Sequence, residues 1–79
     1  MKLLKFGPNM TELQYADGLR VLVSYETPVA ARLEDGEYVR AKRFVSRSTN
    51  HHIAKWIPAG TPGVREIAIE DLAALVERK

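Results

Sequence analysis

The sequence contains no cysteine. Disulfide bonds, thiolate zinc sites and thiol chemistry are therefore excluded, and the absence favours a reducing compartment such as the cytoplasm. No apolar run approaches the roughly 20 residues of a membrane span. The start of the chain, residues 1–5, is too short and too interrupted for a signal peptide. We expect a cytoplasmic protein without a membrane partner.

Signatures of catalysis are also missing from the chain. It has no P-loop, no GxGxxG loop and no nucleophile elbow. The two histidines, His51 and His52, are adjacent, so on a helix their side chains point about 100° apart and cannot chelate one ion together. A zinc site would need a third histidine or a cysteine, and neither exists. We expect no catalytic residue, no metal site, no cofactor and no enzymatic activity.

The residues that are present suit one globular domain over 1–79. The chain has 79 residues, of which 46% are apolar, and a net charge of only +2, a balance that argues against a disordered polyelectrolyte. Two Asp-Gly pairs, Asp17-Gly18 and Asp35-Gly36, lie between runs of alternating apolar and polar residues. This pattern predicts two hairpins, with type I′ turns in which glycine takes a positive φ.

Alternation of polarity predicts four antiparallel strands. In the second of them Val21 and Leu22 are both apolar, which indicates a strand covered on both sides. We place the strands at residues 10–16, 19–25, 29–34 and 37–45.

The second half of the chain changes to a helical period. Ile53, Trp56 and Ile57 share one stripe of a helix over 49–57, for which Ser46 or Ser48 supplies the N-cap. Residues 69–77 form a second helix, with acids in its first turn. The predicted fold class is α+β: a four-stranded antiparallel meander followed by two helices packed on one face, with a possible short extra strand near 64–67.

Positive charge is concentrated in residues 38–56, which hold five basic side chains and no acidic one. Such a concentration suits phosphate groups or an acidic protein surface. An ordinary solvated face is the alternative. The helix start adds free N–H groups and hydroxyl donors, which favour anions. The candidate nucleic-acid-binding residues are Arg40, Lys42, Arg43, Arg47, Ser48, Thr49, Asn50, His51 and Lys55.

Three segments carry a resemblance to a known family. They are Ser24-Tyr25-Glu26-Thr27-Pro28-Val29-Ala30, Arg40-Ala41-Lys42-Arg43 and Ser46-Arg47-Ser48-Thr49-Asn50-His51-His52-Ile53-Ala54-Lys55-Trp56-Ile57. The chain resembles a family of short phage- and plasmid-encoded prokaryotic proteins without an established activity. That family has a Ser-Tyr-x-Thr-Pro-Val-Ala strand and a Ser-x-Thr-Thr-Ser-Arg-His-Ile-x-x-Trp-Leu helix start. Ala41, Asn50 and His51 depart from the family pattern. The resemblance implies a mobile-element origin and no mechanism.

These observations favour a small phage or mobile-element accessory protein that binds nucleic acid, DNA rather than RNA, through the basic strand and helix start within 40–55. The alternative is a protein-interaction module that inhibits or modulates a host protein by contacting an acidic surface. A third interpretation is a virion or structural component. The free edges of the predicted sheet could also pair with a second copy, which would give a homodimer.

Overall fold

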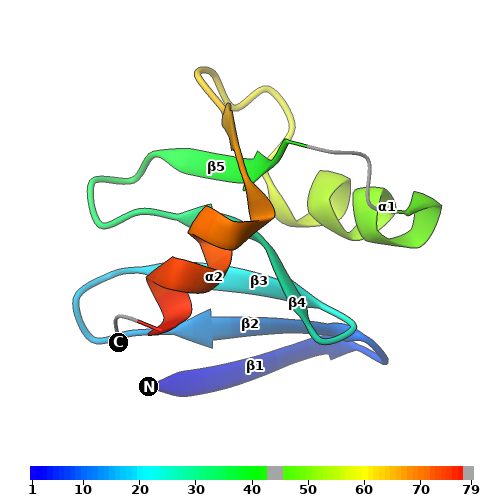
Figure 1. The fold of residues 1–79 in the computed structure, drawn as a ribbon, viewed down its shortest axis with the longest axis horizontal. Coiled ribbons are helices and arrows are strands. Elements are labelled where there is room, and N and C mark those ends of the chain that lie inside the picture. The colour runs from blue at the N-terminus through cyan, green and yellow to red at the C-terminus, as the bar shows by residue number, and fades with distance from the viewer. Residues whose placement is uncertain (43–45, 78–79) are drawn as a thin grey trace.

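A computed structural model describes residues 1–42 and 46–77, and within them the chain forms a six-stranded sheet and two helices (Figure 1). The strands lie in the sheet in chain order: β1 Lys2–Gly7, β2 Met10–Gln14, β3 Arg20–Ser24, β4 Thr27–Arg32, β5 Tyr38–Ala41 and β6 Arg65–Ile67. The helices are α1 Arg47–Trp56 and α2 Ile69–Glu77. Strands β1 to β5 pair antiparallel, whereas β6 pairs parallel to β5.

The predicted α+β class is confirmed, and so are the short strand near 64–67, now β6, and the second helix at 69–77. The sheet nevertheless has two strands more than the predicted meander and is mixed rather than purely antiparallel. Strand β1 was not predicted, because its adjacent residues Leu3 and Leu4 break the alternation of polarity. The strand predicted over 37–45 is described only as far as Ala41, and its end at 43–45 lies outside the described residues.

Both Asp-Gly pairs form hairpin turns, as predicted, but the turn type differs. Tyr15 N–H donates to Leu19 O at 2.9 Å and Gly18 N–H to Tyr15 O at 3.1 Å, so the loop has three residues. Gly18 takes a φ of +99°, whereas Asp17 is not among the residues with positive φ, as a type I′ turn would require. The carboxylate of Asp17 accepts a hydrogen bond from Leu19 N–H at 3.0 Å.

An irregularity in β4 explains how this strand accommodates a proline. The register passes from Leu22↔Ala30 to Val23↔Pro28, so Val29 is an extra residue in a β-bulge. Pro28 has no N–H to donate, and a bulge is one of the few places where a sheet tolerates that loss. The bulge also lets Val29 and Ala30 both enter the same buried cluster.

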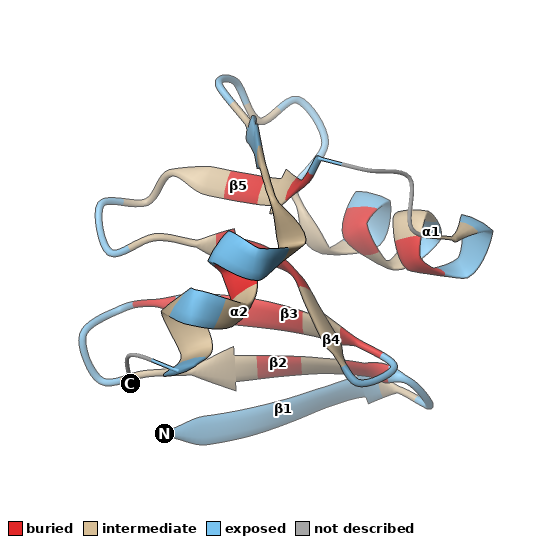
Figure 2. Cartoon of the chain, viewed as in Figure 1, coloured by how far each residue is buried: buried red, intermediate tan, exposed pale blue. Residues whose placement is uncertain are grey.

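The helices cover opposite faces of the sheet, so the expectation that both pack on one face is wrong. Consecutive strand residues point to opposite faces. Val21 packs in a cluster with Leu72 of α2, whereas Leu22 packs in a second cluster with Ile53 of α1. In Figure 1 α2 crosses in front of the sheet, and Figure 2 shows the buried residues of β3 in red. We call the two faces the α1 side and the α2 side.

Candidate nucleic-acid interface

Of the two serines that the sequence offered as N-cap, Ser46 takes this role, so α1 begins two residues earlier than the predicted helix over 49–57. Ser46 has an extended backbone, and its Oγ accepts a hydrogen bond from Thr49 N–H at 3.0 Å. The helix contains no acidic residue, and its buried residues are Thr49 and Ile53. Arg47, His51 and Lys55, four residues apart, are all exposed. Because residues four apart share one face of a helix, these three form a single basic stripe that points to solvent.

A buried polar cluster fixes the start of α1 on the sheet. Ser24 Oγ, on β3, lies 3.0 Å from Thr49 Oγ1 and 2.7 Å from His52 Nδ1, both within hydrogen-bonding distance. Thr49 is only 3% exposed. Its predicted role as a nucleic-acid contact is therefore corrected: the Thr49 hydroxyl faces the sheet and positions the helix. His52 is half-buried at the edge of the same cluster, and its Nδ1 is satisfied by Ser24 Oγ.

Arg40 and Asn50 are brought together, but beneath the helix rather than on its outer surface. Arg40 Nη2 donates to Asn50 Oδ1 at 3.0 Å, and both residues are half-buried. Arg40 Nε is buried and has no hydrogen-bond partner among the described residues. This pair links β5 to α1 and offers less charge to a ligand than the sequence suggested.

The remaining predicted interface residues divide into two groups. Lys42, Arg47, Ser48, His51 and Lys55 are exposed. Arg43 lies outside the described residues. Since Arg47, His51 and Lys55 share the outer side of α1, the helix stripe is the part of the predicted site that the fold assembles.

A row of basic side chains on the sheet escaped the sequence analysis. Arg20 is directly opposite Gln14 on one neighbouring strand and Arg32 on the other, and Arg32 is opposite Tyr38. Residues paired in this way point to the same face, which here is the α1 side. The two arginines come from separate strands, so only the register joins them. Each arginine stands between two apolar residues in the sequence, and this placement was the available signal.

The row and the helix stripe meet at a cleft of about 390 Å³ on the α1 side. Its lining includes the cations Arg20 and Lys55 and the aromatic residues Phe6, Tyr38 and Trp56. The rings of Tyr38 and Trp56 meet edge to face, with centroids 5.6 Å apart. The cleft therefore combines positive charge at its rim with aromatic surface inside.

Glu12 lies in the wall of this cleft and is only 5% exposed. Its Oε1 accepts a hydrogen bond from Trp56 Nε1 at 2.7 Å, and its other oxygen accepts one from Gln14. These two donors compensate part of the cost of burying a carboxylate. They also show that Trp56, which shares a helical stripe with the apolar Ile53 and Ile57, makes a polar contact that joins the end of α1 to β2.

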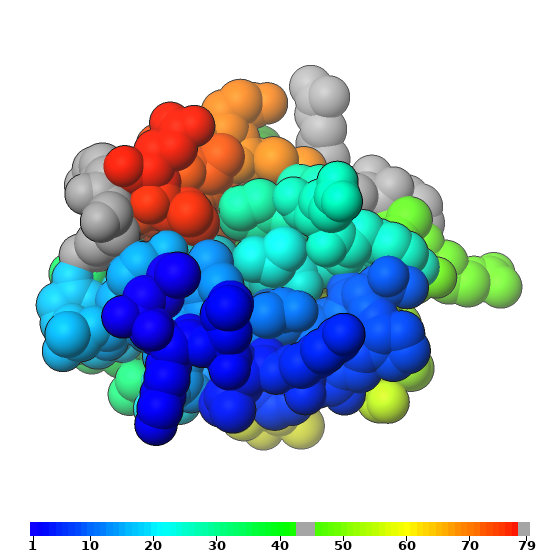
Figure 3. Space-filling model, turned by 90° about the horizontal axis from the view of Figure 1, so that it is seen from below, coloured from blue at the N-terminus to red at the C-terminus, as the bar shows by residue number. Residues whose placement is uncertain are grey.

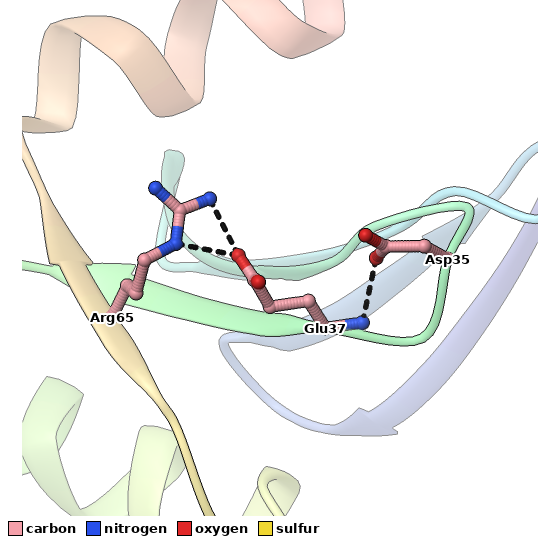
Figure 4. Close-up of polar contacts among 3 residues, drawn as sticks. All are labelled: Asp35, Glu37 and Arg65. Atoms are coloured by element: carbon pink, nitrogen blue, oxygen red, sulfur yellow. Dashed lines mark hydrogen bonds and ion pairs between the residues drawn. The ribbon is translucent and has the colours of Figure 1, made fainter.

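The α2 side carries an ion pair and further acidic side chains. Arg65 is neutralised there by an ion pair with Glu37, whose N–H donates in turn to Asp35 Oδ1 at 2.9 Å (Figure 4). Helix α2 adds Glu70 and Asp71 in its first turn. By contrast, no described residue forms an ion pair with Arg20, Arg32, Arg47 or Lys55. Uncompensated cations thus gather on the α1 side.

Comparison with protein-family models places this architecture in a family. The model of a family of unknown function (DUF8033) matches residues 1–70, which include the whole sheet and α1. The chain belongs to this family. The DUF8033 match is consistent with the resemblance to a family without an established activity. Neither the curated proteins nor the solved structures contain a match to the chain.

The described residues of this DUF8033 domain contain neither a membrane-spanning helix nor a cluster of metal-binding side chains. Neither described helix is long and apolar enough to cross a membrane. No cluster of three or more histidine and carboxylate side chains within the described residues has the arrangement of a metal site.

Proposed function

We propose that this protein binds nucleic acid, DNA in preference to RNA, through its α1 side. The observation that carries the proposal is the presence on one side of the sheet of two sets of cations without ion pairs among the described residues: Arg47 and Lys55 on the helix, and Arg20 and Arg32 on the sheet. One member of each set, Lys55 and Arg20, lines the same cleft. A concentrated, uncompensated positive field attracts the phosphate backbone, which supplies most of the affinity of nucleic-acid-binding proteins.

The shape of the site favours duplex DNA. Helix α1 has ten residues and lies against the sheet along its Thr49 and Ile53 stripe, which leaves its basic stripe outward. The major groove of B-DNA is wide enough for an α-helix, whereas that of A-form RNA is deep and narrow. Contacts from arginine and lysine to phosphates give little sequence specificity by themselves.

The aromatic cleft makes single-stranded DNA a second ligand to compare. Phe6 is 54% exposed, and Trp56 is half-buried beside it in the cleft lining. Unpaired bases stack on exposed aromatic rings with little regard to sequence. If the protein binds a single strand more tightly than a duplex, the cleft rather than the helix stripe makes the main contact with DNA.

The test is a fluorescence-anisotropy titration of a labelled duplex at several salt concentrations. Replacing Arg47 and Lys55 together by alanine should weaken binding and reduce the slope of log K against log salt by about 1.8, at roughly 0.9 per phosphate contact. The matched control is Arg65→Ala, which removes a cation of the α2 side already paired with Glu37. Undetectable binding at low salt, or an equal effect of the control, would contradict the proposal.

A second candidate function is a protein-interaction module for an acidic protein surface. The specific observation in its favour is the exposed apolar surface of Leu4 and Phe6 beside the basic side chains, since the centre of a protein interface excludes most charge. A pull-down from nuclease-treated lysate would separate the two: a retained acidic protein favours this function. The expected phage or mobile-element origin, and a role as a virion component, stay predictions.

A further inference from the structure

Strand β1 leaves an apolar sheet edge uncovered. Leu3, Leu4 and Phe6 are 63%, 43% and 54% exposed, and within the described residues no strand lies beyond β1. Figure 2 shows the strand exposed along most of its length, and Figure 3 shows it spread across the surface. The opposite edge strand, β6, has three residues, including the charged Arg65 and Glu66. A short charged edge resists pairing with another strand, whereas a long apolar edge invites it.

The hydrogen bonds of the neighbouring strands fix which backbone groups of β1 are free. Tyr15 N–H donates to Leu19 O, and Tyr25 N–H donates to Asn9 O, so the odd-numbered residues of β2 turn their backbone groups toward β3. The even-numbered residues of β2 therefore turn toward β1. Glu12 is opposite Leu4, so Leu4 bonds inward to β2. The N–H and C=O groups of Leu3 and Lys5 consequently point to the free edge.

We propose that this edge pairs with β1 of a second copy of the chain, antiparallel and around a two-fold axis at Leu4. In this register the outward groups of Leu3 bond to those of Lys5 of the other copy, which uses every free backbone group of the strand centre. Leu4 then faces Leu4, and Lys2 faces Phe6, so the apolar side chains are covered and each lysine meets an apolar residue. The ammonium of Lys2 beside the ring of Phe6 adds a favourable cation–π contact.

The two lysines select this register over its neighbours. Pairing centred on Lys5 would place two like charges directly opposite each other, which is unfavourable. Pairing centred on Leu3 would overlap only residues 2–4 of the two strands and leave Phe6 outside the paired segment. The register centred on Leu4 is the one that overlaps residues 2–6 completely and opposes no two lysines.

The geometry of this pairing has a consequence for the α1 side. Directly opposite residues of paired strands point to the same face. The two-fold axis therefore runs perpendicular to the sheet, and both copies present α1 on the same side. Two six-stranded sheets become one continuous sheet whose basic helices lie on a common face. The dimer does not require the proposed nucleic-acid binding, because it is argued from β1, which shares only Phe6 with the lining of the aromatic cleft.

The first test measures the mass of the chain by light scattering over a range of concentrations. We expect twice the mass of the single chain at high concentration. Lys5→Pro removes the outward N–H without removing a bond to β2 and should give a monomer, whereas Lys5→Gln keeps the N–H and should remain dimeric. Far-UV circular dichroism checks that both variants fold. A wild-type monomer at every concentration, or a dimer unaffected by a folded Lys5→Pro variant, would overturn the proposal.

The second test reads the register, and it exploits the absence of native cysteine. At a two-fold axis the Cα atoms of facing residues lie about 4.5 Å apart in a pair without hydrogen bonds, within the range for a disulfide. Leu4→Cys should therefore cross-link the dimer under mild oxidation. Leu3→Cys should not, because two copies of residue 3 would lie roughly 8 Å apart, two positions out of register. Efficient cross-linking of Leu3→Cys with none of Leu4→Cys would overturn the proposed register.

Discussion

The hydrogen bond between Trp56 Nε1 and Glu12 Oε1 joins the end of α1 to β2 across 44 positions of the chain. The indole N–H is a donor only, and the Glu12 carboxylate, 5% exposed, needs donors to offset its loss of water. At the scale of single residues, this contact sets the shape of the cleft, because it holds the Trp56 ring beside Tyr38.

Trp56→Phe should lower the free energy of unfolding by about 1–3 kcal/mol, since a buried acceptor loses its donor. Urea denaturation measures the change. The control is the double variant with Glu12→Met, which removes both polar partners. It should cost less than the sum of the two single changes, with a coupling of about 0.5–3 kcal/mol. Additive costs would mean that the hydrogen bond contributes nothing to stability.

A substitution at Gly18 tests the backbone conformation of the first hairpin. Its φ is +99°, and a Cβ there would find Glu34 Cα at 4.0 Å, which is no clash. Gly18→Ala should therefore lower the free energy of unfolding by about 1–2 kcal/mol, the cost of a left-handed conformation with a side chain. Gly7→Ala is the matched control, because Gly7 has no positive φ and no atom within 4 Å of an added Cβ. Equal effects of the two changes would contradict this account.

At the scale of elements, α1 is placed by its ends. Ser46 caps the first turn, the Ser24 cluster holds Thr49 and His52 against β3, and Trp56 closes the last turn. The helix also connects β5 to the parallel strand β6, and parallel strands require such a crossover. Because both ends of α1 are bonded to the sheet, its basic stripe has one fixed direction.

Ser46→Ala should lower the free energy of unfolding by about 1 kcal/mol, because Thr49 N–H loses its side-chain acceptor. Ser48→Ala is the control: this serine is exposed in the first turn and should change stability by less than about 0.5 kcal/mol. Thermal denaturation followed by circular dichroism compares the two. A larger effect at Ser48 would assign the cap to the wrong serine.

At the scale of the whole molecule, charge is distributed unevenly over the two faces. The α2 side carries Glu70, Asp71 and the neutralised Arg65, whereas the α1 side carries, beside the buried Glu12, several cations that form no ion pair with a described residue. Arg20 and Arg32 even stand directly opposite each other, an arrangement that repels. A protein that keeps such a pair sacrifices some stability, as binding surfaces commonly do.

Arg20→Gln should therefore raise stability and weaken binding in the same variant. The gain in free energy of unfolding should be about 0.2–1 kcal/mol at low salt, and it should shrink as salt screens the repulsion. Anisotropy titration should show weaker binding to a DNA duplex. Arg65→Gln, which removes the ion pair with Glu37, should leave binding unchanged. Lower stability of the Arg20 variant with normal binding would show that this row serves the fold.

The sequence by itself determined the features that depend on neighbouring residues. Each Asp-Gly pair sets a hairpin, because glycine accepts a positive φ and the aspartate bonds its own turn. Ser46 and the stripe of Ile53 set the start and the inward face of α1, and Arg47, His51 and Lys55 follow on its outward face. These features are local, so propensity, capping and periodicity suffice to predict them.

Only the tertiary structure decided which groups meet across the chain. Leu22 signalled a strand covered on both sides, yet nothing local says that α1 takes one face and α2 the other. The register aligns Arg20 with Arg32, and the return of α1 to the sheet brings Trp56 to Glu12. Residues 2–7 form strand β1 because their backbone groups pair with those of β2. Such pairings depend on register and crossover, which place residues distant in sequence on one face, and no local pattern encodes them.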